Sequence, residues 1–299
     1  MGLFEKREPC AICGGKVKAL LPWTVDGRLI CNNCYGQVDL PGGTAENMSF
    51  EEFRQYLAFR KENAMLKNRF QVSLEVDFGW FDTKFLIDTH NCLLCMDKNL
   101  DKTIFEGRHI KSFVIREDAS PLFEGSAAGL ICHNSSVADW AMAVAPQINQ
   151  YRLQREMQDY LNRGCNNNSS TPYIDIPEPF KEFIVEIQFE HPYWTFFSAD
   201  MNGPEFNNSA PDINNYLSCY RQDVQLMKQF ATALRDISFP NAPIQQDTPT
   251  SQAAAYYGGN APATGVDTVE EIRRFKALMD QGIITEEEFA AKKTQLLGI

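Results

Sequence analysis

Two pairs of cysteines near the N-terminus have the spacing of a metal site. Cys10 and Cys13 form one C-x-x-C pair, Cys31 and Cys34 form another, and seventeen residues separate Cys13 from Cys31. Thiolates three residues apart on a tight turn can approach one ion from the same side, and two such pairs are typical of a tetrahedral zinc site. Four thiolates leave no open coordination position. The pattern therefore predicts structural Zn²⁺ rather than a catalytic ion.

The alternative interpretations of these four cysteines are a pair of disulfides, four free buried thiols or an iron–sulfur cluster. A segment of about 40 residues needs a metal or another cross-link to fold well. The chain holds nine cysteines, an odd number, and no apolar leader follows Met1. Both observations favour thiols and metal in a cytoplasmic protein over a disulfide framework. A further C-x-x-C, Cys92 to Cys95, is predicted to lie on a strand as buried apolar residues.

The N-terminal segment resembles a small bacterial zinc-ribbon-like domain of unknown function. The resemblance rests on the Met-Gly-Leu-Phe start, on the C-x-x-C-Gly-Gly run from Cys10 to Gly15, and on the closing pair Cys31 and Cys34. It implies the zinc ligands and no activity. We expect this module to span residues 1–48.

Charge separates the chain into regions. The formal net charge is −11 in 299 residues, yet the first 69 residues are mildly basic and the acidity belongs to residues 72–237. An acidic middle domain opposes binding to anionic lipids, which need clustered lysine and arginine. The predicted helix 49–69 carries basic side chains that could line a nucleic-acid backbone, namely Arg54, Arg60, Lys61, Lys67 and Arg69. Nucleic-acid binding by the zinc module and this helix is therefore the alternative function.

The middle region, residues 70–237, reads as an antiparallel sheet followed by a helix, so the fold class is α+β. The helix, from Asp212 to Ile237, has apolar residues every three or four positions and an aspartate N-cap. Strands are predicted at Val72–Phe78, Trp80–Ile87, Cys92–Met96, Thr103–Phe105, Ser112–Arg116, Gly129–Cys132, Phe183–Phe189 and Tyr193–Ser198. This order is similar to a pleckstrin-homology-like domain, in which one curled sheet is closed by a helix.

Two segments interrupt or follow this domain. An insertion at about 134–170 is predicted to be helical and kinked near Pro146. Residues 238–266 contain four prolines, three glycines and a single charge, which predicts a flexible linker. Asp118–Ser120 and Asp200–Gly203 are predicted to be loops.

Residues 267–299 read as two short amphipathic helices around Gly282. They resemble the short C-terminal domain SHOCT in Leu278, in the run Gly282 to Phe289, and in the lysine pair and leucine pair near the end. The resemblance implies a role in oligomerisation or partner binding. The predicted contact residues are Val269, Ile272, Phe275, Leu278, Phe289 and Leu296. Docking back on the middle domain is the alternative.

No common catalytic motif is present, and the histidines His90, His109, His133 and His191 form no pair with helical spacing. No apolar run approaches 18 residues, so we expect no membrane span. The sequence thus predicts a non-enzymatic, zinc-binding adaptor or scaffold that contacts a protein partner through its C-terminal hairpin.

Overall fold

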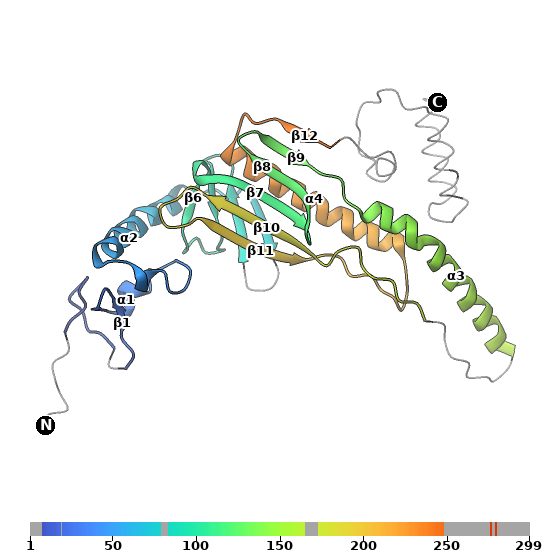
Figure 1. Ribbon diagram of the computed structural model, residues 1–299, viewed down its shortest axis with the longest axis horizontal. Helices are drawn as coiled ribbons and strands as arrows, with labels where there is room; N and C mark the ends of the chain where they lie inside the picture. Colours follow the sequence, from blue (N-terminus) through green and yellow to red (C-terminus); the bar gives the residue numbers. More distant parts are fainter. Residues whose placement is uncertain are drawn as a thin grey trace.

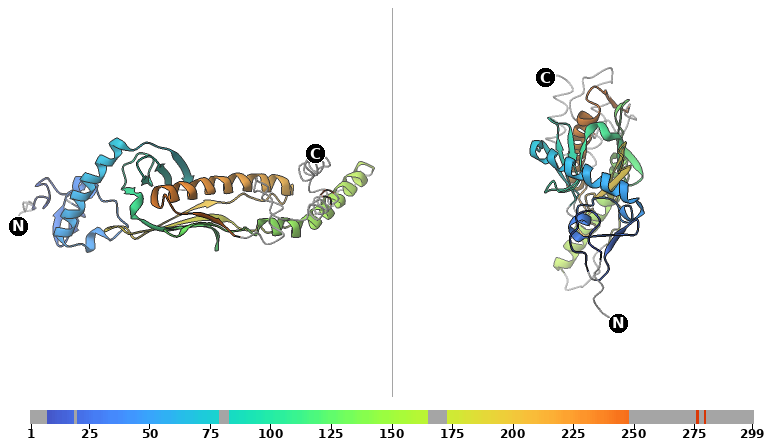
Figure 2. Two further views of the ribbon diagram at one scale, coloured as in Figure 1. Left: turned by 90° about the horizontal axis from the view of Figure 1, so that it is seen from above. Right: turned by 90° about the vertical axis from the view of Figure 1, so that its left-hand side faces the viewer.

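A computed structural model describes residues 8–18, 20–78, 83–164 and 173–247, together with Lys276 and Met279. The molecule is elongated, with a small N-terminal module at one end, two sheets and a long helix in the centre, and a helix that projects from the other end (Figures 1 and 2). None of the described helices is both long and apolar enough to cross a membrane.

The N-terminal module is built on a β-hairpin. Strands β1 (Trp23–Val25) and β2 (Arg28–Ile30) pair antiparallel, and the short helix α1 (Asn32–Tyr35) and the 3₁₀ turn η1 (Ala45–Asn47) follow. The turn between the strands is Asp26-Gly27, and both residues have positive φ, at 50° and 71°. An Asp-Gly pair favours this two-residue turn, so the hairpin, which we did not predict, had a signal in the sequence.

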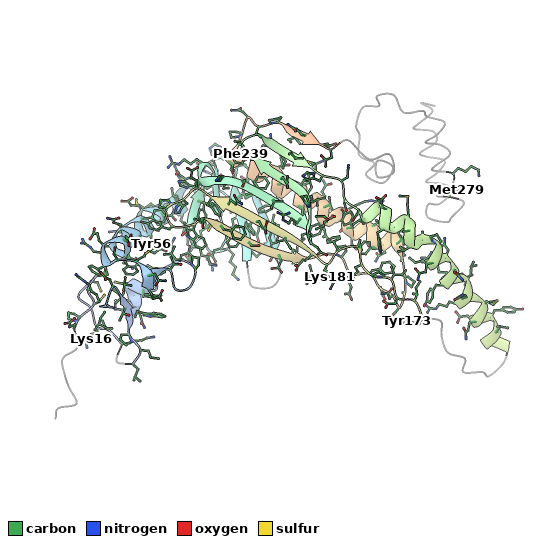
Figure 3. The ribbon with its side chains drawn as sticks, viewed as in Figure 1. Lys16, Tyr56, Tyr173, Lys181, Phe239 and Met279 are labelled. Carbon is green, nitrogen blue, oxygen red and sulfur yellow. The ribbon has the colours of Figure 1, made fainter. Side chains whose placement is uncertain are left out.

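Helix α2 (Phe50–Asn63) continues into the 3₁₀ segment η2 (Ala64–Arg69). It begins at a capping box, in which Ser49 and Glu52 satisfy each other's backbone N–H groups. The predicted helix 49–69 is thus present, with its last turns wound more tightly. Phe53 and Tyr56 on α2 are buried in one core with the hairpin and three of the cysteines, so the module and this helix pack as one unit (Figure 3).

In the part of the chain that the structure describes, ten further strands form two sheets rather than one. The first is an antiparallel meander of β3 (Leu74–Phe78), β4 (Thr83–Asp88), β5 (Leu93–Cys95) and β6 (Ile104–Glu106). The second has the order β11-β10-β7-β8-β9-β12. Its strands are β7 (Ile110–Glu117), β8 (Ser120–Ser126), β9 (Gly129–Cys132), β10 (Glu182–Phe189), β11 (Phe196–Asn202) and β12 (Ile244–Gln246).

Most predicted strands are present, with three corrections. Strand β8 was not predicted. The predicted strand Tyr193–Ser198 begins later, at Phe196, and continues through Asp200, which was expected in a loop. Cys92 precedes β5 and has a φ of 54°, so only Cys95 lies on a strand, where it is buried.

Helix α4 (Ile213–Ser238) packs against strands of both sheets and buries its predicted apolar stripe between them (Figure 1). Asp212 caps its N-terminus as expected, because its carboxylate accepts from the N–H groups of Asn214 and Asn215. The sheets separate at η3 (Gly107–His109), which interrupts the chain between β6 and β7. Among the described residues the strands therefore form neither the predicted single curled sheet nor a barrel, and the pleckstrin-homology-like arrangement is not confirmed.

The insertion forms one helix, α3 (Val137–Gly164), with Pro146 inside it. The predicted linker 238–266 begins later than expected. Ala242 is buried, and β12 pairs parallel with β9, which would otherwise be an open edge. Residues 248–266 lie outside the described residues, as do the predicted contact residues of the hairpin. Lys276 and Met279 are helical.

Candidate metal centre

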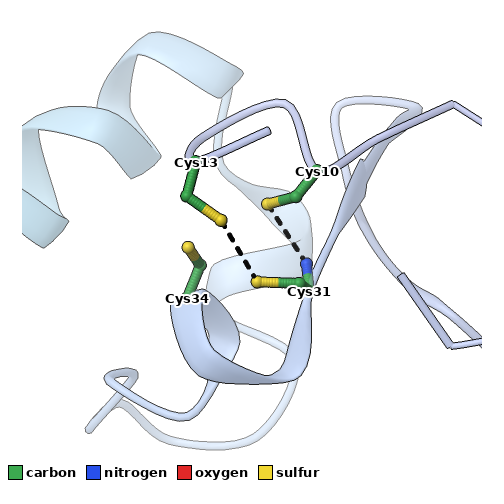
Figure 4. A group of neighbouring side chains, drawn as sticks. All are labelled: Cys10, Cys13, Cys31 and Cys34. Atoms are coloured by element: carbon green, nitrogen blue, oxygen red, sulfur yellow. Dashed lines mark hydrogen bonds between the residues drawn. The ribbon is translucent and has the colours of Figure 1, made fainter. Parts of the chain in front are cut away.

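The two cysteine pairs converge. The sulfurs of Cys10, Cys13, Cys31 and Cys34 all lie within 4.8 Å of one another (Figure 4). Four sulfurs bound to one zinc ion at about 2.3 Å are separated by roughly 3.8 Å, and the Cys13 and Cys31 sulfurs are 3.5 Å apart. The spacing is compatible with one tetrahedral ion held by all four sulfurs.

The backbone around the first pair forms a tight turn that aims the thiols inward. The N–H of Gly14 donates to the carbonyl of Cys10 at 2.8 Å, and the N–H of Cys10 donates to the carbonyl of Gly15 at 2.9 Å. Gly14 takes a φ of 70°, a conformation that glycine adopts without strain. This glycine directly follows the first pair in the sequence, and the positive φ of the turn explains why a glycine occupies that position.

The second pair opens helix α1. Cys31 is the N-cap residue, and the N–H of Tyr35 donates to its carbonyl at 2.9 Å. The N–H of Cys31 points across to the first pair and donates to the Cys10 sulfur at 3.3 Å. Each pair therefore supports the other, as N–H to sulfur bonds do in thiolate metal sites.

The electrostatics of the cluster favour a cation. Burial opposes ionisation of Cys10, but the backbone N–H groups of Cys31, Cys13 and Ile12 outweigh it and lower the pKa of this thiol to about 6. Burial and the neighbouring thiols raise the pKa of Cys34. Four thiolates at these distances repel one another, so a bound cation is what would allow all of them to ionise.

Aromatic side chains pack around the four-cysteine cluster and join the elements that carry it. The ring of Trp23 on β1 stacks on Tyr35 of α1, with centroids 3.9 Å apart and planes inclined by 2°. The guanidinium of Arg28 lies 4.3 Å from the centre of the Phe50 ring at the start of α2. These contacts join the hairpin, the second cysteine pair and α2. The sequence analysis did not find them.

Helix α2 also fastens the module to the first sheet. The carboxylate of Asp39 accepts from the N–H of Thr103 at 2.6 Å. The buried side chain of Asn63 makes two hydrogen bonds with the backbone of Ile104 on β6, donating at 2.7 Å and accepting at 2.9 Å. These hydrogen bonds join the module that carries the four cysteines to the first sheet.

The same contacts occupy the basic residues of the predicted nucleic-acid surface. Arg60 donates to the carbonyls of Gln37 and Asp101 and to Thr103. Three more of these basic side chains form ion pairs within the protein. The pairs are Arg54 with Glu51, Lys67 with Asp101 and Arg69 with Glu106. Four of the five basic side chains thus have acidic or carbonyl partners within the protein.

Two of the four histidines lie together inside the protein. His109 and His191 come together with ring centroids 5.0 Å apart, a pairing that their sequence separation hid. The His191 ring packs against Phe59 and Phe105, and burial lowers the pKa of both His109 and His191. They are neutral packing residues at pH 7. His133 instead pairs with Asp247 and Glu124.

Within the described residues, the four cysteines are the one group of three or more possible ligands placed to hold a metal ion. Comparison with curated proteins and with solved structures finds no match. Comparison with family models matches residues 270–297 to the short C-terminal domain, SHOCT. The chain thus ends in a SHOCT domain, as its residues indicated.

Proposed function

We propose that this protein is a non-enzymatic, zinc-binding adaptor of the cytoplasm, whose SHOCT domain makes the contact with a partner. The observation that carries the proposal is the closed cluster of four cysteine sulfurs within 4.8 Å. A four-thiolate ion has no free position for substrate, so its role is to hold the fold. The described cysteines form no disulfide, which fits a reducing compartment.

The zinc ion would stabilise the module that its ligands frame. The module core contains few large side chains besides those of α2, so metal binding supplies a large part of its folding free energy. The ordered module then presents α2 to the first sheet. The SHOCT domain, at the other end of the chain, supplies the contact surface.

Metal analysis of the purified full chain tests the zinc centre. We expect one equivalent of zinc, retained through dialysis, and its loss in Cys31→Ser. Cys219→Ser is the matched control, because Cys219 is an exposed thiol on α4 that is not among the four clustered cysteines. Less than about half an equivalent in the native protein, with no difference between the two variants, would refute the centre.

Recovery of binding partners tests the adaptor role. The full chain and a chain that ends at Asp247 are used as baits, and the recovered proteins are identified by mass spectrometry. We expect a defined set that the shorter chain loses while both chains keep their zinc. Turnover of a defined substrate that a middle-domain substitution abolishes would contradict the non-enzymatic assignment.

No described contact favours the nucleic-acid alternative. Its basic helix face is engaged by the module and the first sheet. These internal partners neutralise part of the positive charge that phosphate binding would use.

A further inference from the structure

The projecting end of α3 carries an apolar stripe that none of the described residues covers. Four large side chains at spacings of four, three and one residue share one face of the helix. They are Leu153, Met157, Tyr160 and Leu161, with exposed fractions of 67%, 62%, 79% and 61%. Large apolar side chains that cluster on an exposed helix face are candidates for an interaction site.

The opposite face of α3 is the one that meets the body. Ile148 and Tyr151 are buried there. Arg152 and Arg155 then donate to the carbonyls of Pro211 and Ser209, at 3.0 and 3.3 Å. The stripe therefore points away from the protein, on a helix that extends past both sheets (Figures 1 and 2).

The chain that leads to the SHOCT domain leaves the body beside the start of this helix. Strand β12 runs parallel to β9, and the N–H of Asp247 donates to the carbonyl of Cys132 at 2.9 Å. The Asp247 carboxylate also lies 2.8 Å from Nδ1 of His133. Helix α3 begins at Val137, only a few residues after His133, so the exit point is fixed at the base of α3.

The length of chain beyond that point matches the distance to the stripe. The helix rises about 1.5 Å per residue, so Leu153 and Leu161 lie roughly 24 and 36 Å from its start. The SHOCT match begins at residue 270, which leaves residues 248–269 as the connection. The root-mean-square span expected for a linker of this length with no regular structure is about 25 Å. Effective concentration is highest when span and distance agree, and reaches the millimolar range.

The SHOCT domain has the complementary chemistry. Its first predicted helix carries an apolar stripe that includes Ile272, Phe275 and Leu278. Of the two described residues in this helix, Met279 is partly buried and Lys276 is exposed. Two helices of about twelve residues are marginal alone in water, so this stripe needs a partner.

We propose that the SHOCT domain docks in cis on the exposed α3 stripe, and that a partner must displace it from there. The inference rests on the proposed contact role of the SHOCT domain and adds its resting site. Docking lowers a partner's apparent affinity by the fraction of chains left undocked, which is roughly tenfold where the local concentration, in the millimolar range, exceeds the cis dissociation constant about tenfold.

Hydrogen exchange of the full chain, read by mass spectrometry, tests this docking. The stripe variant is Met157→Ser with Tyr160→Ser. The matched control is Asp159→Ser, which places the same residue on the same turn but outside the stripe. We expect amides of residues 270–297 to exchange about tenfold faster in the stripe variant than in the native chain or the control. The variant Phe275→Ser should likewise speed exchange in residues 153–161.

Three results would overturn the proposal. One is equal protection of residues 270–297 in the native chain and the stripe variant. Another is an unprotected SHOCT domain in the native chain. A third is protection that falls on dilution of a dimer, which would assign the stripe to a second copy. Zinc content and partner recovery are measured on the same variants. These two readouts test the adaptor function separately, so each of the three results can refute the docking without refuting that function.

Discussion

Replacement of Asn63 by alanine should loosen the joint between the metal module and the first sheet. Asn63 closes α2, and its amide pairs with both the N–H and the carbonyl of Ile104, as a neighbouring strand would. The side chain is 8% exposed, so water has little access to these groups. Asn63→Ala removes both hydrogen bonds and leaves two backbone groups without partners.

The size of the effect follows from those two groups. Each hydrogen bond contributes about 1 kcal/mol net, while each buried group left unsatisfied costs about 1–3 kcal/mol. Partial entry of water into the space left by the amide reduces the sum. We expect the free energy of unfolding to fall by about 3 kcal/mol.

Urea unfolding, followed by tryptophan fluorescence and by far-ultraviolet circular dichroism, measures this change. The matched control is Asn47→Ala, because Asn47 makes one exposed hydrogen bond, to the carbonyl of Gly43. The control should lose less than about 1 kcal/mol. The reasoning fails if Asn63→Ala stays within 1 kcal/mol of the native protein or cannot be distinguished from the control.

Three further substitutions test other parts of the fold. Gly107→Ala should cost about 2 kcal/mol or more in urea unfolding, because a Cβ there would lie 1.9 Å from the carbonyl oxygen of Ile237, whereas Gly42→Ala, with nothing within 4 Å, should be near neutral. Burial raises the pKa of Glu117 above its usual 4.5, so its contribution to stability is complete below that pH and is lost as the pH rises through the folded pKa. The free energy of unfolding of Glu117→Gln should therefore rise relative to that of the native protein as the pH increases from 4.5 to 8. A constant difference between the two would contradict this. Burial lowers the pKa of His191 to about 4. The stability that its neutral ring contributes is therefore complete above pH 6.5 and is lost as the pH falls through the folded pKa. His191→Phe should lose less stability than the native protein between pH 6.5 and 4, as thermal unfolding at each pH would show.

The sequence was most informative where chemistry repeats locally. Paired cysteines, the amphipathic stripe of α4 and the Asp212 cap each depend on spacing within a few residues, and the structure has all of them. Gly14, next to the first pair in the sequence, has the positive φ that the tight turn requires.

Features that depend on distant contacts were hidden. Strand β8 contains Pro121 and Gly125, which argue against a strand when read alone. In the sheet, Gly125 leaves room for the Phe113 ring, since a Cβ there would lie 2.1 Å from it. The separation of the two sheets likewise depends on Gly107 packing against α4, far along the chain. The basic face of α2 looked open because its partners, such as Asp101, are remote in sequence.

Strand β12 also determines where this protein can be shortened. Its three exposed residues cover the outer edge of β9, whose backbone groups would otherwise be free to pair with any extended chain. A fragment cut directly after α4 would uncover that edge and would invite strand-by-strand aggregation, whereas a fragment that ends after Asp247 keeps it sealed. Part of the segment predicted to be a linker therefore protects the sheet from pairing with other chains at this edge.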